Sequence, residues 1–455
     1  LDANTTGASN VAVGHQALTA NTTANYNTGV GYDALAANTT GAHQVALGAF
    51  ALDSNTTGGE NTGLGYNTLG ANTTGDNNTA VGHRALDANT TASDNTAIGS
   101  NALGANTTGG TNVAVGSGAL QTSTTAANNT AVGKGAAYAT TTGPSNTAVG
   151  KSALNANTTG ANNVAIGYYA YATDTDGDGT TAIGYHALKD TTVGGTTAVG
   201  YYAAEALTTG GMTVAIGKQC LRYGTTANQN TAVGEQAMEG VSGSSTGSYN
   251  VAMGLRALEG FTTADHNTAI GYYAMMANTG GNNNTALGAY ALDANTTASN
   301  NIAIGYSALT ANTTGSTNVA IGVLALAANV DGANNVAIGY NCLNDSTGTS
   351  NNIAIGYGCL QVTTTGSLNV ALGTNTLDAN TTGSNNCAIG YNGLGASTTA
   401  SHNTALGYGT LGSNTTGERN IAIGKSALDR PDTEDDNLAI GYDALGGTIA
   451  GGEKN

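Results

Sequence analysis

Apolar and polar positions alternate in a pattern that repeats through the whole chain. Residues 27–41 read Asn-Thr-Gly-Val-Gly-Tyr-Asp-Ala-Leu-Ala-Ala-Asn-Thr-Thr-Gly, and residues 301–315 read nearly the same. In each copy, a glycine follows a three-residue segment whose first and last residues are β-branched or aliphatic. An Ala-Leu pair and an Asn-Thr-Thr turn follow. This alternation, bounded by turn residues, predicts one short strand per copy.

The glycine after each predicted strand sets the period. Successive glycines are 17 residues apart, except for a gap of 16 from Gly184 to Gly200 and one of 20 from Gly234 to Gly254. A fixed period of this kind is typical of solenoids, in which each repeat forms one coil. We therefore predict an all-β fold, a parallel β-solenoid of about 26 coils of 17 residues. It would form a single rod over residues 1–455, roughly 125 Å long at about 4.8 Å per coil.

Three positions around this glycine, which we number 0, indicate what the coil encloses. Position −1 is always a larger apolar residue, and position +4 is Leu in 21 of 26 coils. We predict that both point into the coil and meet across it. Position −2 lies on the opposite face of the strand and is Ala everywhere except at Gly29 and Gly63. Its small size predicts close packing there, against either a partner chain or the coil's own second wall.

Two stretches depart from the pattern. Residues 170–262 are the least regular coils and contain both altered gaps, the longer of which adds three residues within 240–250. Insertions in solenoids form loops on one face, which often bind ligands. The turn at 429–436 is the most densely charged one, and we interpret it as the approach to a boundary.

The turn and the position after the glycine predict ladders of identical side chains. Asn-Thr-Thr occurs twelve times, and in register these copies would stack, each side chain bonding its equivalent in the next coil. Position +1 is often Tyr, which predicts a partial aromatic ladder facing outward. Such a ladder usually serves as packing and occasionally as a platform for glycans.

Composition excludes several classes of function. The chain has 455 residues, a net charge of −17 and only 11 Lys and Arg. A nucleic-acid binder needs clustered cations to neutralise phosphates, so no nucleic-acid partner is expected, and an anionic membrane surface is disfavoured for the same reason. No run of 18 or more apolar residues exists, so no membrane span is expected.

One acidic turn resembles the start of a calcium-binding loop. Asp174, Asp176 and Asp178 alternate with small residues, which would supply carboxylates for Ca²⁺. The twelfth position of the loop is Tyr185, however, where an EF-hand has a bidentate Glu. A calcium site formed by the three aspartates and a plain acidic turn are therefore both open, and no other cofactor is indicated.

The cysteines and histidines suggest no catalytic site. Cys220, Cys342 and Cys359 occupy position +3 and Cys387 position −3, which favours small buried residues. Adjacent coils would also place Cys342 and Cys359 within reach of a disulfide bond.

No His has a recurring Ser, Cys or Asp partner, so we expect no enzyme. The alternative, a carbohydrate-cleaving enzyme, would need paired carboxylates across a groove.

The repeat also resembles a known family. Asn-Val-Ala-Ile-Gly-Tyr-Tyr-Ala at 163–170 resembles the repeats of YadA-like heads in trimeric autotransporter adhesins, and the consensus is similar to repeats of phage tail-fibre shafts. The resemblance implies a left-handed β-roll, commonly trimeric. It implies a non-enzymatic extracellular structural fibre or adhesin at the cell surface, for surface attachment or filament formation. The alternative is a tail-fibre shaft of a virion for host recognition. Expected partners are copies of the chain itself, as a trimer or stacked end to end, and a glycan or protein receptor.

Overall fold

The computed structural model describes residues 1–430 and 433–447 and confirms the predicted fold class. Over these residues the chain is all-β, with short parallel strands joined by turns and no helices. It divides into two compact units, Leu1–Ala227 and Asn228–Asn455, which are described separately. The division falls inside residues 170–262, the stretch with both altered gaps.

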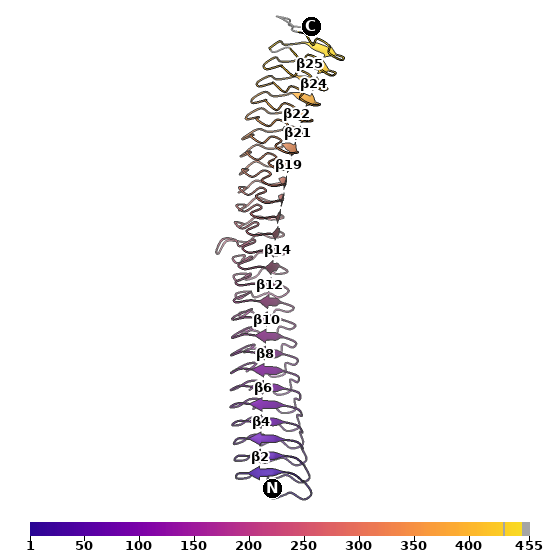
Figure 1. Cartoon of the computed structure of the whole chain (residues 1–455). Helices are drawn as coiled ribbons and strands as arrows, with labels where there is room; N and C mark the ends of the chain where they lie inside the picture. The colour runs from indigo at the N-terminus through magenta and orange to yellow at the C-terminus, as the bar shows by residue number, and fades with distance from the viewer. Residues whose placement is uncertain (431–432, 448–455) are drawn as a thin grey trace. The chain divides into compact units, whose positions relative to one another are not determined.

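The first unit holds thirteen strands of three residues each, one per coil (Figure 1). They pair in parallel and in register, so that Val11 aligns with Thr28 and Val13 with Val30. The strands are β1 (Val11–Val13), β2 (Thr28–Val30), β3 (Val45–Leu47), β4 (Thr62–Leu64), β5 (Thr79–Val81), β6 (Thr96–Ile98), β7 (Val113–Val115), β8 (Thr130–Val132), β9 (Thr147–Val149), β10 (Val164–Ile166), β11 (Thr181–Ile183), β12 (Thr197–Val199) and β13 (Val214–Ile216).

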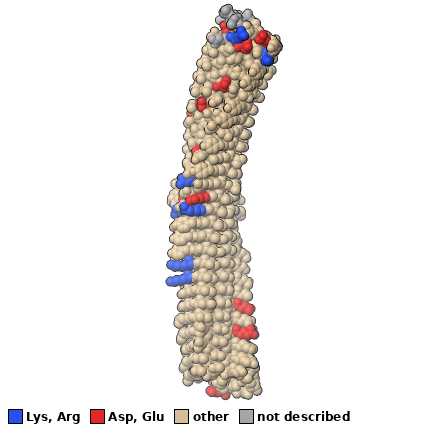
Figure 2. All heavy atoms as spheres, viewed as in Figure 1, with Lys and Arg blue, Asp and Glu red and all other residues tan. Residues whose placement is uncertain are grey.

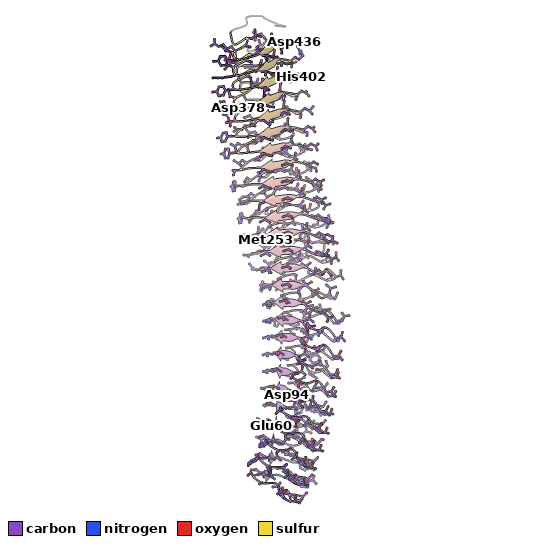
Figure 3. The ribbon with its side chains drawn as sticks, turned by 90° about the vertical axis from the view of Figure 1, so that its right-hand side faces the viewer. Glu60, Asp94, Met253, Asp378, His402 and Asp436 are labelled. Atoms are coloured by element: carbon purple, nitrogen blue, oxygen red, sulfur yellow. The ribbon has the colours of Figure 1, made fainter. Side chains whose placement is uncertain are left out.

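The second unit repeats the arrangement, and its rows of equivalent side chains can be followed from coil to coil (Figure 3). Register survives the insertion, because Thr231 pairs with Val251 and Val233 with Met253. The strands are β14 (Thr231–Val233), β15 (Val251–Met253), β16 (Thr268–Ile270), β17 (Thr285–Leu287), β18 (Ile302–Ile304), β19 (Val319–Ile321), β20 (Val336–Ile338), β21 (Ile353–Ile355), β22 (Val370–Leu372), β23 (Cys387–Ile389), β24 (Thr404–Leu406), β25 (Ile421–Ile423) and β26 (Leu438–Ile440).

The strands face the opposite way from the prediction at position −1. Ala46, at position −2, is fully buried, whereas Leu47, at position −1, is 45% exposed. The small side chain points inward because the coil's own second wall is close. A Cβ on Gly29 would lie 3.3 Å from Leu18 Cγ, at position +4 of the preceding coil. Position +4 does point inward as predicted, but it meets position −2. The coil is too narrow for a large side chain on both walls.

The backbone conformation requires the glycine at position 0. Gly31 has a φ of 143°, and a Cβ there would collide with the carbonyl oxygen of Gly48 in the next coil. Only glycine combines this conformation with such a close approach of two coils. The same relation recurs along the chain, which explains the regular spacing of this residue.

The turns put leucine in a conformation usually left to glycine. Leu35 has a φ of 54°, as does Leu52 in the next coil. The left-handed region costs roughly 1–2 kcal/mol for such a residue, which burial of the side chain offsets. None of the Asn-Thr-Thr asparagines has a positive φ among the described residues. These asparagines therefore do not supply the left-handed residues of the turn.

These asparagines form the predicted internal ladder. Asn55 Nδ2 donates hydrogen bonds to Asn38 Oδ1 at 2.9 Å and to the Gly58 carbonyl at 2.9 Å, while Asn55 Oδ1 accepts one from Asn72 Nδ2 at 2.8 Å. The threonine ladder runs through the main chain, since Thr56 Oγ1 donates to the Thr73 carbonyl at 3.0 Å. Both ladders satisfy polar groups that the thin core cannot expose to water.

The three extra residues form a loop between β14 and β15. Its chain is held by Ser245, which accepts a hydrogen bond from the Val241 amide at 2.7 Å and donates one to the Phe261 carbonyl at 2.9 Å. Ser245 is fully buried, whereas Val241 is 47% exposed. The insertion is therefore anchored at its base and exposed at its tip.

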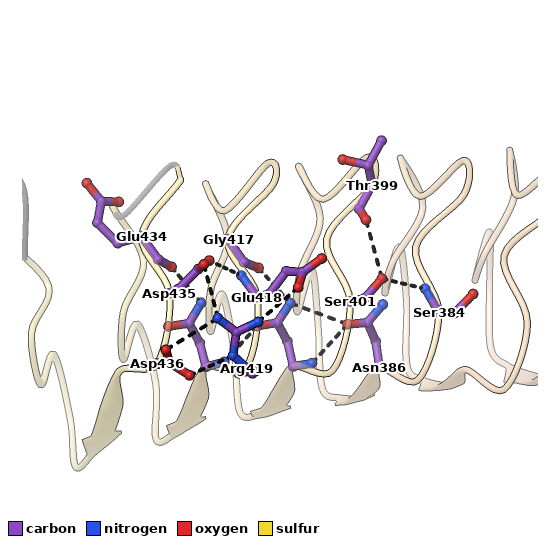
Figure 4. Close-up of polar contacts among 12 residues, drawn as sticks. Ser384, Asn386, Thr399, Ser401, Gly417, Glu418, Arg419, Glu434, Asp435 and Asp436 are labelled. Carbon is purple, nitrogen blue, oxygen red and sulfur yellow. Dashed lines mark hydrogen bonds and ion pairs between the residues drawn. The ribbon is translucent and has the colours of Figure 1, made fainter. Parts of the chain in front are cut away.

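The charged turn at 429–436 is joined to the preceding coil through Arg419 (Figure 4). Its guanidinium contacts Asp436 at 2.7 Å, Asp435 at 3.2 Å and Glu418 at 3.0 Å. Residues 431–432 of the predicted boundary lie outside the described part. The described charges of this turn bind two coils together.

Candidate functional site

The strands of each unit present an aliphatic face, which we define as the side chains at positions −3 and −1. Position −1 is Val, Ile, Leu or Met throughout, and position −3 is Thr, Val, Ile, Leu or Cys. Val13 is 57% exposed, and Ile440 in the second unit is 66% exposed. Neither position carries a charged side chain in any coil. The face is therefore apolar or weakly polar along each unit.

The size of this face separates it from ordinary exposed hydrophobic residues. In the first unit, ten of the 26 side chains on this face are 36–57% exposed and the other sixteen are partly buried. Together they expose on the order of 1,000 Å², above the few hundred Å² that monomeric proteins usually leave open. A stable protein interface needs roughly 800 Å² from each partner. The aliphatic face is therefore large enough for an interface between chains.

Next to the glycine at position 0, the residues at position +1 form the outward aromatic ladders that the sequence predicted. Tyr340 and Tyr357 stack with their ring centroids 5.3 Å apart, and Tyr391 and Tyr408 stack at 5.1 Å. Stacked rings shield one another's faces and leave edges and hydroxyl groups exposed. The ladders therefore present rows of phenol hydroxyls more than flat platforms.

The three aspartates of the calcium hypothesis do not converge. Asp174 is buried, and its carboxylate accepts hydrogen bonds from the Thr175 and Gly177 amides, both at 2.9 Å, and from the Tyr171 hydroxyl. Asp176 and Asp178 are exposed. Within residues 1–430 and 433–447, no group of three or more His, Cys, Asp and Glu side chains is arranged to hold a metal ion.

Tyr171 explains this acidic substitution without a metal. It replaces the usual Leu at position +4, and its hydroxyl reaches the Asp174 carboxylate inside the coil. Burial, together with this hydrogen bond, raises the pKa of Tyr171 above its ordinary value. Asp174 takes the place of a ladder asparagine because it can accept the tyrosine hydroxyl.

None of the four cysteines, all within the described residues, forms a disulfide bond. Cys342 and Cys359 are buried in adjacent coils, where their thiols donate to the Gly356 carbonyl at 2.7 Å and the Gly373 carbonyl at 2.6 Å. Burial also raises the pKa of Cys220 to about 12. Cys387 differs, because it lies half-buried on the aliphatic face. Three thiols thus fill the core and one faces outward.

Histidines lie along the aromatic ladders, and one belongs to a charged cluster. His186 Nδ1 lies 3.2 Å from the Glu205 carboxylate, which also contacts Arg222 Nε at 3.1 Å. His186 stacks on Tyr185 with centroids 4.2 Å apart. No sequence pattern marks this cluster, since its members come from three different coils.

The aliphatic face was also missed, although a signal for it existed. Position −2 never varies beyond Ala and Gly, whereas positions −3 and −1 exchange side chains of different shape and polarity. Tolerance of that kind is typical of a surface. The invariant small residue marks the packed side of the strand.

No protein-family model matches this chain, and no curated protein matches it. Residues 1–430 and 433–447 include no helix long and apolar enough to be a transmembrane segment.

Proposed function

We propose that the chain is a non-enzymatic structural fibre or adhesin outside the cell, in which copies associate side by side through the aliphatic face. One observation carries the proposal: a wide apolar surface on a chain that is otherwise polar and acidic. The likeness of the repeat to adhesin heads and fibre shafts supports the same function.

A second copy of the chain is the occupant that best fits this face. It offers an equally apolar strip with the same spacing between coils, so that side chains of two copies can interdigitate repeatedly. The face carries no charge that would have to be buried unpaired, which is the main cost of such interfaces. The acidic residues on other faces repel further copies and limit association to this one.

Sedimentation of the full chain tests the proposal. The variant combining Leu47→Lys, Leu64→Lys and Ile98→Lys puts three charges on the aliphatic face, where the wild-type side chains are 45%, 40% and 40% exposed. We expect association to weaken at least about tenfold, since an unpaired charge buried in an apolar contact costs more than about 1.4 kcal/mol.

A matched control adds the same charge elsewhere. Thr40→Lys, Thr57→Lys and Thr91→Lys lie on exposed turns of the same unit and should leave association unchanged. Circular dichroism should show strand content retained in both variants. A wild-type chain that sediments as a monomer at all concentrations, or equal behaviour of the two variants, would overturn the proposal.

A further inference from the structure

The few cations of this acidic chain are concentrated in one stretch. Five of the 11 Lys and Arg residues fall between 134 and 222. Three of them, Lys134, Lys151 and Lys218, occupy position +1, the outward position that elsewhere often holds tyrosine. Figure 2 shows Lys and Arg atoms at one edge of the molecule, with Asp and Glu atoms beside the upper ones.

These lysines belong to one continuous column in the first unit. The column occupies six successive coils, and strands β8 to β13 pair in register beneath it. It is about 24 Å long at the spacing of adjacent strands. All its members are exposed, and we call it the basic tyrosine column: Lys134, Lys151, Tyr168, Tyr185, Tyr201 and Lys218.

The tyrosines in the middle of the column stack on one another. Tyr168 stacks on Tyr185 with centroids 5.3 Å apart and planes at 10°, and Tyr185 stacks on Tyr201 at 5.3 Å and 21°. Lys151 Nζ lies 5.4 Å from the Tyr168 ring centroid. Tyr168 and Tyr185 are thus covered on both faces, so the column offers mainly hydroxyl edges between ammonium groups.

A second row of side chains packs behind the column. This row contains one carboxylate, which its neighbours neutralise. Arg222 lies 4.5 Å from the ring centroid of Tyr202 and bonds Glu205, which also contacts His186. The Glu205 charge is thereby compensated within the row. Every residue at position +1 from 134 to 218 is Lys or Tyr, so the six members of the column include three formal positive charges and no carboxylate.

The shape and charge of this column point to one class of ligand. A linear polyanion with hydroxyl groups between its charges would place the charges near the lysines and the hydroxyls along the tyrosine edges. Single-stranded nucleic acid fits less well, because its bases bind by stacking on open aromatic faces. A membrane surface would need a broader basic and apolar patch.

We propose that the basic tyrosine column binds an acidic polysaccharide lying along the coils. The proposal rests on the attachment function above and names the class of surface polymer attached. The chain's net charge of −17 repels a polyanion from other faces, so that binding concentrates on this column.

Polygalacturonate oligomers are the probe, titrated calorimetrically into the full chain at low and high salt, with neutral dextran as a negative control. Lys134→Gln, Lys151→Gln and Lys218→Gln combined should weaken binding about tenfold, as expected for three exposed ion pairs, and should reduce its salt dependence. The corresponding Lys→Arg variant should retain binding. Replacement of Arg84, Arg256 and Lys425 by Gln changes the net charge equally and should have little effect.

The outcomes separate this proposal from the proposed function. A chain that associates in sedimentation but does not bind polygalacturonate would overturn only the polysaccharide site. Equal binding by the two Gln variants would overturn it as well. Tighter binding of single-stranded DNA than of polygalacturonate would show a nucleic-acid surface instead. A chain that never associates would overturn the fibre proposal, whatever it binds.

Discussion

The Thr68 hydroxyl oxygen lies 2.9 Å from the point that a Cβ atom on Gly63 would occupy. Gly63 is one of the two residues at position −2 that are not alanine, and Thr68 stands at position +3, where alanine is common. The two residues share one coil and one small space. The missing methyl group at Gly63 accommodates the larger side chain of Thr68.

Restoring alanine at this position therefore tests the packing of the coil. Gly63→Ala should lower the free energy of unfolding by about 1–3 kcal/mol, because overpacking forces the neighbouring hydroxyl to move. Adding Thr68→Ala should recover most of this loss, which a double-mutant cycle measures from denaturant unfolding. Additive effects of the two substitutions would contradict the shared space. Gly29→Ala, whose nearest contacts lie at 3.3 Å, is the milder comparison.

The asparagine ladder is interrupted at some coils, and one such interruption allows its contribution to stability to be tested. Ser397 stands between Asn380 and Asn414, and Ser397 Oγ and Asn380 Oδ1 have no hydrogen-bond partner within the described residues. In intact parts of the ladder, each Nδ2 donates to the Oδ1 of the preceding coil. A serine is too short to continue this chain of bonds.

Ser397→Asn should repair the break. Its Nδ2 would reach Asn380 Oδ1, and its Oδ1 would accept from Asn414 Nδ2, adding about 1–2 kcal/mol to the local free energy of unfolding. Amide hydrogen exchange over the neighbouring coils measures this gain. Ser397→Ala removes the hydroxyl without extending the ladder and should give no such protection. Equal exchange in the Asn and Ala variants would contradict the prediction.

Period, strand positions and ladders could be predicted because they depend on which residues recur. Which face of each strand points into the coil could not be predicted. The alternation in Val45–Leu47 only places residues 45 and 47 on one face and Ala46 on the other. The usual preference for burying the larger side chain gave the wrong choice. In this narrow coil the space opposite Leu52 admits only Ala or Gly, which is a property of the closed backbone.

At the candidate sites too, some features could be predicted from the sequence and others could not. The carboxylates of Asp174, Asp176 and Asp178 have calcium-loop spacing, but Asp174 occupies the buried ladder position and accepts a hydrogen bond from Tyr171, a contact that spacing does not reveal. The cluster of His186, Glu205 and Arg222 likewise arises from stacking of three coils. The ladder positions were predictable from period alone because each residue meets its own equivalent.

Two half-buried aspartates should make stability depend on pH. Burial raises the pKa of Asp53 and of Asp378, and Oδ1 of each is buried without a hydrogen-bond partner among the described residues. A raised pKa in the folded state means that the ionised carboxylate destabilises the fold. That penalty is present at neutral pH and disappears as the pH falls through the folded-state pKa towards the unfolded value.

Asp53→Asn and Asp378→Asn should therefore stabilise the protein at pH 7, and the difference from wild type should vanish at acidic pH. Thermal unfolding measured across this range gives both quantities. Glu60→Gln, at an exposed position, removes the same charge and should produce a smaller change at pH 7. A stability gain that persists unchanged at low pH would contradict burial of the carboxylates as its cause.

Cys387 reports directly on whether the aliphatic face is covered. It is the half-buried thiol at position −3 of β23, whereas Cys220, Cys342 and Cys359 are fully buried. In dilute solution one thiol should react quickly with a disulfide reagent, and all four should react after denaturation. At concentrations where chains associate, the Cys387 rate should fall about tenfold or more, because the interface excludes the reagent. A Cys387→Ser/Thr399→Cys variant moves the thiol to an exposed turn, where its rate should not change with concentration. If Cys387 reacted equally fast at all concentrations while sedimentation showed association, the contact between chains would lie elsewhere than on the aliphatic face.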